Sequence, residues 1–507
     1  MRPSPSRSHT DPTRRAFLGG GAALLAASTL PAPLRAASAP IPLRIGTRTI
    51  EVGGRAAEVF GIADAAGRAG LVLDRADRFD VEVRNDGPAP EIVHWHGLTP
   101  PFALDGNEVA QAPIDPGGTM RFAFDLARAG TNWMHSHHGL SEQRLLAAPL
   151  VVRDGPPDRQ EVIVMLHDFS FTPPEEILAD LMAGGGHVGS GMAAGRMGLV
   201  RGRAMDHGSM GGMAVMDHGA MAGGAMGGMD HSGMGNMGPM DLNDVAFDAF
   251  LTNDRTLADP EVIAVERGAP VRLRIVNAAA ATNFWIDLGG LGATLVAVDG
   301  MPVRPIAGAR FEIAMAQRLD LEVTIPADGA AVPVLAQREG DLRRTGLILA
   351  PAGATVRKVP DTAEREAPPV LLALERRLAA GEPLPAREVD RRLDVALTGG
   401  MEDYRWGLDG RAWGDHRPAE VSRGERVELT FRNETMMSHP MHLHGHHFQV
   451  VGLGGARLSG AMRDTVIVPA MEAVTIAFDA DNPGDWPLHC HNLYHREAGM
   501  MTTLRYV

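Results

Sequence analysis

Histidines gather in four clusters, two in the first third of the chain and two near its end. Each cluster holds a His-x-His pair, and the last pair encloses the only cysteine of the chain. On a β-strand, residues i and i+2 point to the same face, so each pair presents two imidazoles side by side. The eight imidazoles are those of His94, His96, His135, His137, His442, His444, His489 and His491. Eight such ligands are enough to bind three metal ions between the first and last parts of the chain.

The cysteine suggests a second kind of site. Cys490 is the middle residue of the last pair, so its thiol must point away from the eight imidazoles. A thiolate with two histidines and a weak methionine ligand is the composition of a blue copper site, and His439, His495 and Met500 complete that set. An electron that reaches the cysteine sulfur can then pass through the backbone to either flanking histidine.

Zinc is the competing metal. Structural zinc sites close with four ligands and catalytic ones use three protein ligands, so neither needs ten histidines. One His-x-His pair alone would be weak support for any metal, because paired histidines also occur in cores and at surfaces. Four pairs, with the lone cysteine inside one of them, favour copper.

A repeated strand pattern must position these clusters. Residues 77–85, 268–277 and 424–433 each contain a short turn, an alternating apolar and polar strand, and a closing asparagine. Such alternation is typical of antiparallel sandwiches, and 507 residues suggest about three domains. We therefore predict an all-β fold of three β-sandwich domains, with short helices only near 142–146 and 174–182.

Residues 1–39 are predicted to be an export signal. The paired arginines Arg14 and Arg15 precede Phe17-Leu18, a short glycine-rich apolar run and small residues at 37–39. This order resembles the twin-arginine signal, whose export machinery carries folded proteins. The alternative, a membrane anchor, would need a longer apolar run. We expect a periplasmic, bacterial protein with no membrane span in its mature form.

Residues 184–241 form a methionine-rich insertion with twelve methionines and three Met-Asp-His triplets. Because bulky apolar residues are almost missing, the segment cannot offset the entropy of ordering, and we predict that it is disordered. Thioether sulfur is a soft ligand suited to Cu(I), and imidazole binds either copper oxidation state. The insertion is therefore expected to capture additional Cu(I).

The four clusters resemble, in order and spacing, the ligand signatures of the multicopper oxidases. The resemblance runs from about Ile41 to Val507 and is stronger to the three-domain copper-resistance oxidases than to laccases. It implies three cupredoxin-like Greek-key domains, at 40–155, 156–355 and 356–507. The middle domain would carry no copper ligands, and residues 332–336 indeed contain no His-x-His pair.

The resemblance also implies four copper ions and a role for each ligand. His94 and His442 would hold the type 2 copper, and the other six paired histidines would hold the binuclear type 3 copper. His439, Cys490, His495 and Met500 would hold the type 1 copper. Asp105 stands where relatives place an acid near the three-copper cluster, although Asp-Gly is also an ordinary turn sequence. Some copper-resistance relatives place a glutamate directly after the second type 1 histidine. This chain departs from that pattern, with Arg496 there and Glu497 next, and Glu497 is the second candidate for proton transfer.

The implied reaction is one-electron oxidation of a substrate at type 1 copper, coupled to four-electron reduction of O2 to water. An axial methionine implies a moderate type 1 potential, which suits Cu(I) or electron-rich phenols. Three functions stay open: a cuprous oxidase that gives copper tolerance, a laccase-like phenol oxidase, and a copper-sequestering protein. We expect a monomer, and the net charge of −14 argues against nucleic-acid binding, which needs a basic surface.

Overall fold

The computed structural model describes residues 39–184 and 242–507. Except for residues 39 and 184, the predicted export signal and methionine-rich insertion lie outside these residues. Residues Ile41–Val507 form one compact unit. Within the described ranges, no helix is long and apolar enough to cross a membrane.

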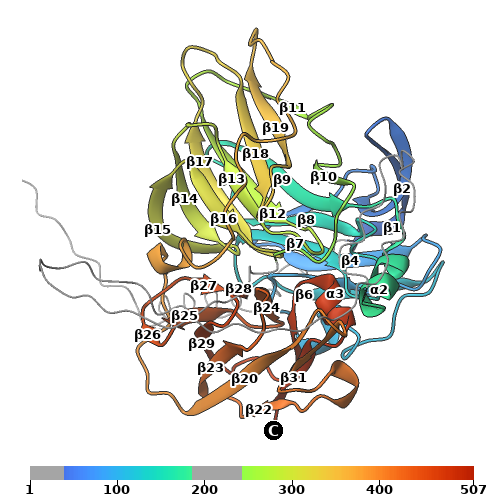
Figure 1. The fold of residues 1–507 in the computed structure, drawn as a ribbon, viewed down its shortest axis with the longest axis vertical. Helices are drawn as coiled ribbons and strands as arrows, with labels where there is room; N and C mark the ends of the chain where they lie inside the picture. Colours follow the sequence, from blue (N-terminus) through green and yellow to red (C-terminus); the bar gives the residue numbers. More distant parts are fainter. Residues whose placement is uncertain (1–38, 185–241) are drawn as a thin grey trace, which may run out of the picture. The chain divides into compact units, whose positions relative to one another are not determined.

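Six β-sheets organise this unit, two from each third of the sequence (Figure 1). In the first third the strand orders are β2-β1-β4-β6 and β3-β8-β7-β5. The strands are β1 (Ile41–Val52), β2 (Arg55–Asp64), β3 (Leu71–Asp74), β4 (Arg78–Asn85), β5 (Val93–His94), β6 (Thr119–Asp125), β7 (Gly130–Ser136) and β8 (Ala147–Arg153). Their apolar faces meet in a core of their own, around Phe79, Trp95 and Phe122.

The middle sheets have the orders β10-β9-β12-β17-β14-β15 and β11-β19-β18-β13-β16. The strands are β9 (Gln160–Phe169), β10 (Ala249–Thr252), β11 (Val262–Val265), β12 (Pro270–Asn277), β13 (Phe284–Asp287), β14 (Ala293–Val298), β15 (Met301–Gly308), β16 (Arg310–Ile313), β17 (Arg318–Thr324), β18 (Val332–Arg338) and β19 (Arg344–Pro351).

The last sheets have the orders β21-β20-β23-β29-β25-β26, with β27 beside β25, and β22-β31-β30-β24-β28. The strands are β20 (Arg391–Gly400), β21 (Arg405–Leu408), β22 (Ala419–Val421), β23 (Arg426–Asn433), β24 (His439–Leu443), β25 (Phe448–Leu453), β26 (Ala456–Arg457), β27 (Met462–Arg463), β28 (Thr465–Val468), β29 (Ala473–Asp479), β30 (Asp485–Cys490) and β31 (Met501–Tyr506). One continuous core joins the middle and last sets of sheets.

The repeated sequence pattern corresponds to β4, β12 and β23. Each is parallel to the strand on one side, namely β1, β9 or β20. Each is antiparallel to the strand on the other side, namely β6, β17 or β29. The predicted all-β fold with repeated strands is therefore confirmed.

The closing asparagine of each repeat has one structural task. Asn85, Asn277 and Asn433 are buried at the strand ends, and each Oδ1 accepts a hydrogen bond from the backbone N–H two residues later. Each Nδ2 donates to carbonyls of two loops, as in Asn433 to Met437 and Val468. An asparagine can both end the strand and satisfy buried loop carbonyls, which explains why it recurs.

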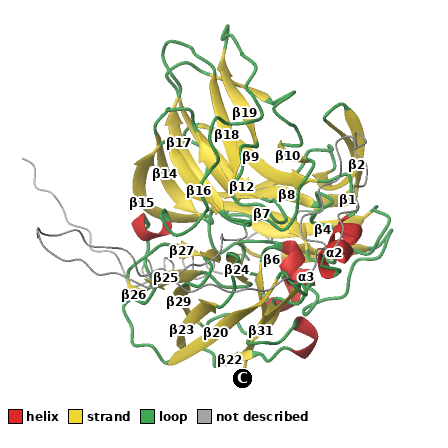
Figure 2. Ribbon diagram, viewed as in Figure 1, coloured by secondary structure: helices red, strands yellow, loops and turns green. Residues whose placement is uncertain are grey.

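Helices are few and short in residues 39–184 and 242–507 (Figure 2). They are the 3-10 helices η2 (Phe102–Leu104), η3 (Glu375–Arg377) and η4 (Trp413–Asp415) and the α-helices α2 (Pro174–Met182) and α3 (Leu493–Glu497). The helix expected at 174–182 is confirmed, with proline in its first turn and Ile177 and Leu181 buried. The helix expected near 142–146 is wrong, because the chain forms turns there and Leu145 has a φ of 65°. A left-handed residue ends helical continuation, so tertiary contacts override the local pattern.

Candidate copper sites

Two strand pairings bring the four His-x-His pairs together. In the first third, β5 pairs with β7 so that His94 lies opposite His135. In the last third, β24 pairs with β30 so that His442 lies opposite His489. The second histidine of each pair follows just beyond its strand, and all eight side chains are buried.

The pairs from the two ends of the chain face each other. The ring centroids of His94 and His444 are 4.0 Å apart, and those of His96 and His442 are 3.9 Å apart. The Nε2 atoms of His137 and His489 are 3.3 Å apart. The eight predicted imidazoles therefore form one cluster between the first and last sets of sheets.

Hydrogen bonds orient most of these rings toward the centre of the cluster. The Nδ1–H groups of His94, His135, His442 and His489 donate to the backbone carbonyls of Asp105, Ser136, Asp464 and Cys490, over 2.8 to 3.0 Å. The Nε2 atoms of His94, His135 and His442 are buried and have no partner among the described residues. His96 has the reverse arrangement, since its Nε2 bonds Asp464 and its Nδ1 has no partner.

Burial also keeps these rings uncharged. Desolvation is the largest cause of the lowered pKa of seven imidazoles, those of His96, His135, His137, His442, His444, His489 and His491. For His442 the pKa falls to about 3. Neutral imidazole is the form that binds metal, and unpartnered buried nitrogens are costly unless a ligand satisfies them. The cluster therefore fits metal ions held by nitrogen ligands.

A second group lies on the opposite side of β30. The Cys490 Sγ atom is 3.6 Å from Nδ1 of His439 and 3.7 Å from Nδ1 of His495. The two Nδ1 atoms are 3.1 Å apart. The backbone N–H of Cys490 donates to the Met500 carbonyl, and the backbone N–H of Met500 donates to the His495 carbonyl. These bonds connect Met500, the fourth predicted ligand, to Cys490 and His495. One sulfur and two imidazole nitrogens converge as a blue copper site requires.

Known proteins share these features. Three sequence profiles, each described as multicopper oxidase, match residues 44–157, 197–336 and 388–507. Multicopper oxidase MmcO of Mycobacterium tuberculosis is 33% identical over 443 residues, which are 85% of this chain and 80% of that protein. Copper resistance protein A of Escherichia coli is 25% identical over 91% of this chain and 92% of its own length.

The chain belongs to the multicopper oxidase family.

The fold agrees with this assignment. A laccase structure from Botrytis aclada covers 92% of this chain and 87% of its own, with a TM-score of 0.71 at 19% identity. The paired sheets thus form the cupredoxin-like fold of multicopper oxidases. As a family member the chain is a copper-dependent oxidoreductase that uses dioxygen as electron acceptor.

Carboxylates that the ligand motifs do not contain surround the oxidase's imidazole cluster. Asp464 contacts His96, Glu108 lies 2.5 Å from Nδ1 of His137, and Glu142 lies 2.9 Å from Nδ1 of His135. Burial raises the pKa of Glu142 to about 8. Sequence reasoning missed all three, and only Glu142, five residues after His137, could have been suggested by its closeness in sequence to a histidine cluster.

The two predicted acids lie in different surroundings. Asp105 is fully buried, and its Oδ2 is 2.7 Å from Nδ1 of His444. Its Oδ1 has no partner in the described part of the chain. Glu497 is partly exposed and ion-paired with Arg496, and no described contact joins it to a histidine of the cluster. A role for either acid in proton transfer stays a prediction.

The predicted type 1 ligands also have buried neighbours. Asp244 Oδ2 lies 2.9 Å from Nε2 of His495 and accepts hydrogen bonds from Tyr404 and Asn492. The Trp406 ring lies against His495, with centroids 4.1 Å apart. His495 is consequently 0% exposed.

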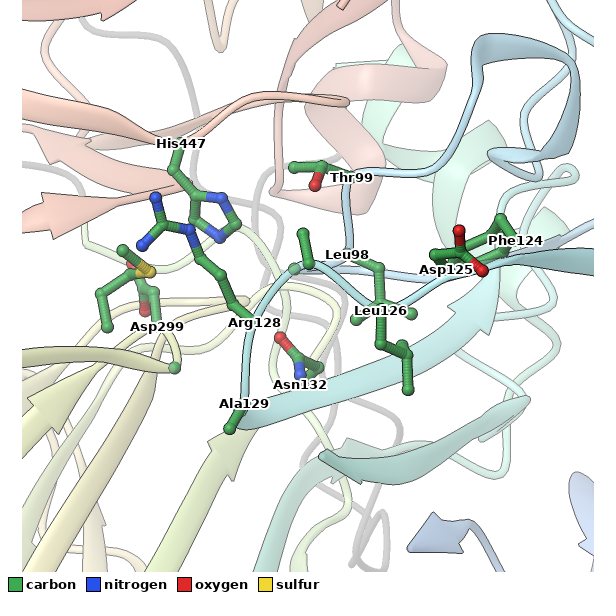
Figure 3. A pocket seen from close by; sticks show the side chains of 14 residues that line it. Leu98, Thr99, Phe124, Asp125, Leu126, Arg128, Ala129, Asn132, Asp299 and His447 are labelled. Carbon is green, nitrogen blue, oxygen red and sulfur yellow. The ribbon is translucent and has the colours of Figure 1, made fainter. Parts of the chain in front are cut away.

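A narrow pocket is lined by segments from the first, middle and last thirds of the chain (Figure 3). Arg128, Asn132, Asp299 and His447 line it, together with Gly97 and Leu98. Gly97, Leu98 and His447 also line a smaller cavity whose walls include His94 and His442. The two hollows share these three residues, and only the smaller one reaches the predicted type 2 ligands.

Proposed function

We propose that this oxidase takes electrons from Cu(I) in the bacterial periplasm and so gives copper tolerance. His439, Cys490, His495 and Met500 would hold the type 1 copper, and the eight paired histidines would hold three more. Four bound coppers would supply the four one-electron carriers that complete reduction of dioxygen to water requires. The twin-arginine signal would export the folded protein.

The observation that carries this proposal is where the methionine-rich insertion joins the described structure. Asp244, which contacts Nε2 of His495, lies two residues after Leu242, where the described chain resumes. At the other end, a Cβ built on Gly184 would be 3.8 Å from the carbonyl oxygen of Glu402. Glu402 is two residues from Tyr404, the hydrogen-bond donor to Asp244. Gly184 and Leu242, the described residues on either side of a sequence rich in Cu(I) ligands, are thus linked through Glu402 and Asp244 to the surroundings of the proposed type 1 histidine.

The burial of His495 supports the same donor. A phenol must bring its ring close to the edge of a ligand imidazole to transfer an electron rapidly. Asp244, Tyr404 and Trp406 are all buried against His495, so the described chain offers no exposed imidazole edge to such a ring. Asp244 is itself buried, and its carboxylate would attract a cation rather than a neutral ring. This arrangement favours Cu(I) over a phenol.

The proposed role of Asp105 is to hold a proton beside the cluster. Its Oδ2 accepts hydrogen bonds from His444 and from Nδ2 of Asn107, and its Oδ1 has no hydrogen-bond partner among the described residues. Because the side chain is rigidly held and excluded from bulk water, it can pass a proton to an oxygen species without moving.

Deleting residues 185–240 tests the proposal. The full chain and the deletion variant are compared for copper content, blue absorption and oxygen uptake with Cu(I) and with a phenol. We expect the variant to keep its blue band, to lose most Cu(I)-driven uptake, and to keep or gain phenol-driven uptake. Unchanged Cu(I) oxidation would contradict a role for the insertion in donor supply. Many bound coppers without a blue band or oxygen uptake in the full chain would favour sequestration instead.

A further inference from the structure

One of the eight imidazoles has no hydrogen bond to hold it. Seven are each anchored through one ring nitrogen by a backbone carbonyl or a carboxylate. His491 has no hydrogen-bond partner at either nitrogen among the described residues, although it is almost fully buried. A ligand imidazole usually donates its second N–H to a partner that fixes the ring orientation and tautomer. His491 therefore needs such a partner.

Glu142 is the group placed to fill this role. Its Oε1 lies 3.8 Å from Nδ1 of His491 and is itself buried, with no hydrogen-bond partner in the part of the chain that the structure describes. Its Oε2 lies 2.9 Å from Nδ1 of His135. His135 comes from β7 of the first sheets, and His491 follows β30 of the last sheets. One carboxylate therefore reaches an imidazole from each half of the cluster.

The turn that carries Glu142 is fastened to the region of the last ligands. Arg496 donates to the carbonyl of Gly139, and the Tyr494 hydroxyl donates to Oε1 of Gln143. Leu145 has a φ of 65°, a left-handed conformation that is costly for leucine and that its surroundings must enforce. Arg496 is buried, and among the charged groups around Glu142 it has the largest favourable electrostatic effect on the carboxylate. These contacts hold the carboxylate in place rather than leaving it free to turn toward solvent.

We propose that Glu142 is a positioning residue that orients His135 and His491 together for the binuclear type 3 copper. The carboxylate would accept the Nδ1–H of His491 through Oε1 once the 3.8 Å separation closes, and through Oε2 it would share the Nδ1–H of His135 with the Ser136 carbonyl. The Nε2 atoms of both rings are then directed to the metal, and both are without partners in the described structure. This inference rests on the ligand assignment proposed above.

Glu142→Ala and Glu142→Gln test the inference. Losing a carboxylate partner of a ligand imidazole typically lowers metal affinity about 10- to 100-fold. We expect Glu142→Ala to lose copper more readily to a chelator by that factor and to lose the near-ultraviolet absorption of the coupled type 3 pair. Its blue absorption per chain should stay unchanged, because Cys490 lies on the other side of β30. Glu142→Gln should recover part of the type 3 absorption, since its amide oxygen can accept one N–H.

Glu339→Gln is the matched control. Glu339 is also fully buried, after β18, where it bonds the amide of Asn283 and the N–H of Val370, and it touches no copper ligand. The Glu339→Gln variant should keep its full copper content and both absorption bands. Electron paramagnetic resonance should show uncoupled copper only in the two Glu142 variants. Unaltered type 3 absorption and chelator resistance in both Glu142 variants would overturn the inference. A wild-type protein without a blue band would instead refute the ligand assignment itself.

Discussion

Replacing Arg318 with methionine should destabilise the whole oxidase. Arg318 begins β17 in the middle sheets, is 0% exposed, and donates from Nη1 and Nη2 to the two oxygens of Asp464 over 2.7 and 2.5 Å. Its Nε donates to the carbonyl of Thr131 in β7. The middle third of the chain has no predicted copper ligands, but its Arg318 holds Asp464 in place. Asp464 in turn contacts His96 and His442.

The magnitude follows from what the variant leaves behind. Removing one partner of a buried ion pair costs about 3–5 kcal/mol, because the remaining charge is buried without compensation. In the variant, Asp464 keeps a hydrogen bond from Thr465, and the neighbouring Asp299 keeps its ion pair with Arg463. We therefore expect the free energy of unfolding to fall by about 3 kcal/mol, the lower end of that range. A unit of roughly 470 residues unfolds with an entropy of about 1 kcal/mol per degree, so Tm should fall by about 3 °C.

Calorimetry of the copper-loaded protein measures this shift, with Arg121→Met as control. Arg121 also makes a two-pronged pair, with Asp80, but its side chain is 52% exposed. Exposed pairs contribute about 0–1 kcal/mol, so the control should move Tm by less than about 1 °C. Adding Asp464→Asn to Arg318→Met should cost less than the two single effects summed, since the two side chains interact directly. Equal Tm shifts for Arg318→Met and Arg121→Met would refute the reasoning.

Three further predictions concern separate parts of the chain. Burial raises the pKa of Glu339 from 4.5 to about 7. Between these two pH values the folded chain keeps a proton that the unfolded chain releases, so the free energy of unfolding falls as pH rises from 4.5 to about 7. Between about pH 5 and about pH 8, wild type should therefore lose on the order of 3 kcal/mol more stability than Glu339→Gln, and parallel pH profiles of Tm would contradict this. Cys490→Ser should abolish the blue band while the type 3 absorption remains, because the eight imidazoles are untouched; loss of both bands would show that the two sites do not form independently. Asn433→Ala should lower Tm by about 1–3 °C, since it removes the buried amide donor to the carbonyls of Met437 and Val468, and an unchanged Tm would count against the role of the closing asparagine.

The sequence predicted the parts of the site whose chemistry is local. A His-x-His pair places two imidazoles on one face whatever surrounds it, and Cys490 must then face the other way. The repeated strands were likewise readable, because alternation and a closing asparagine recur within ten residues. By contrast, the helix expected near 142–146 failed, since contacts of Gly139 and Gln143 with distant Arg496 and Tyr494 impose turns there.

Residues that support the ligands could not be read from the sequence. Asp464 meets His96 across 368 positions, and Arg318 meets Asp464 across 146. Asp244 follows the methionine-rich insertion and meets His495 only because the fold brings the middle and last sheets together. A carboxylate or guanidinium in such a position has no local pattern that separates it from a surface charge, so only the three-dimensional structure reveals it.

The central claim is that Cu(I) supplies electrons through the Cys490 site for complete reduction of dioxygen. Its most direct test is the ratio of Cu(I) oxidised to oxygen consumed in the purified, copper-loaded protein, with peroxide measured in parallel and Cys490→Ser as the control. The account predicts four Cu(I) per dioxygen, no released peroxide, and no enzymatic uptake in the control. Uptake that requires a phenol, or that persists in Cys490→Ser, would contradict it.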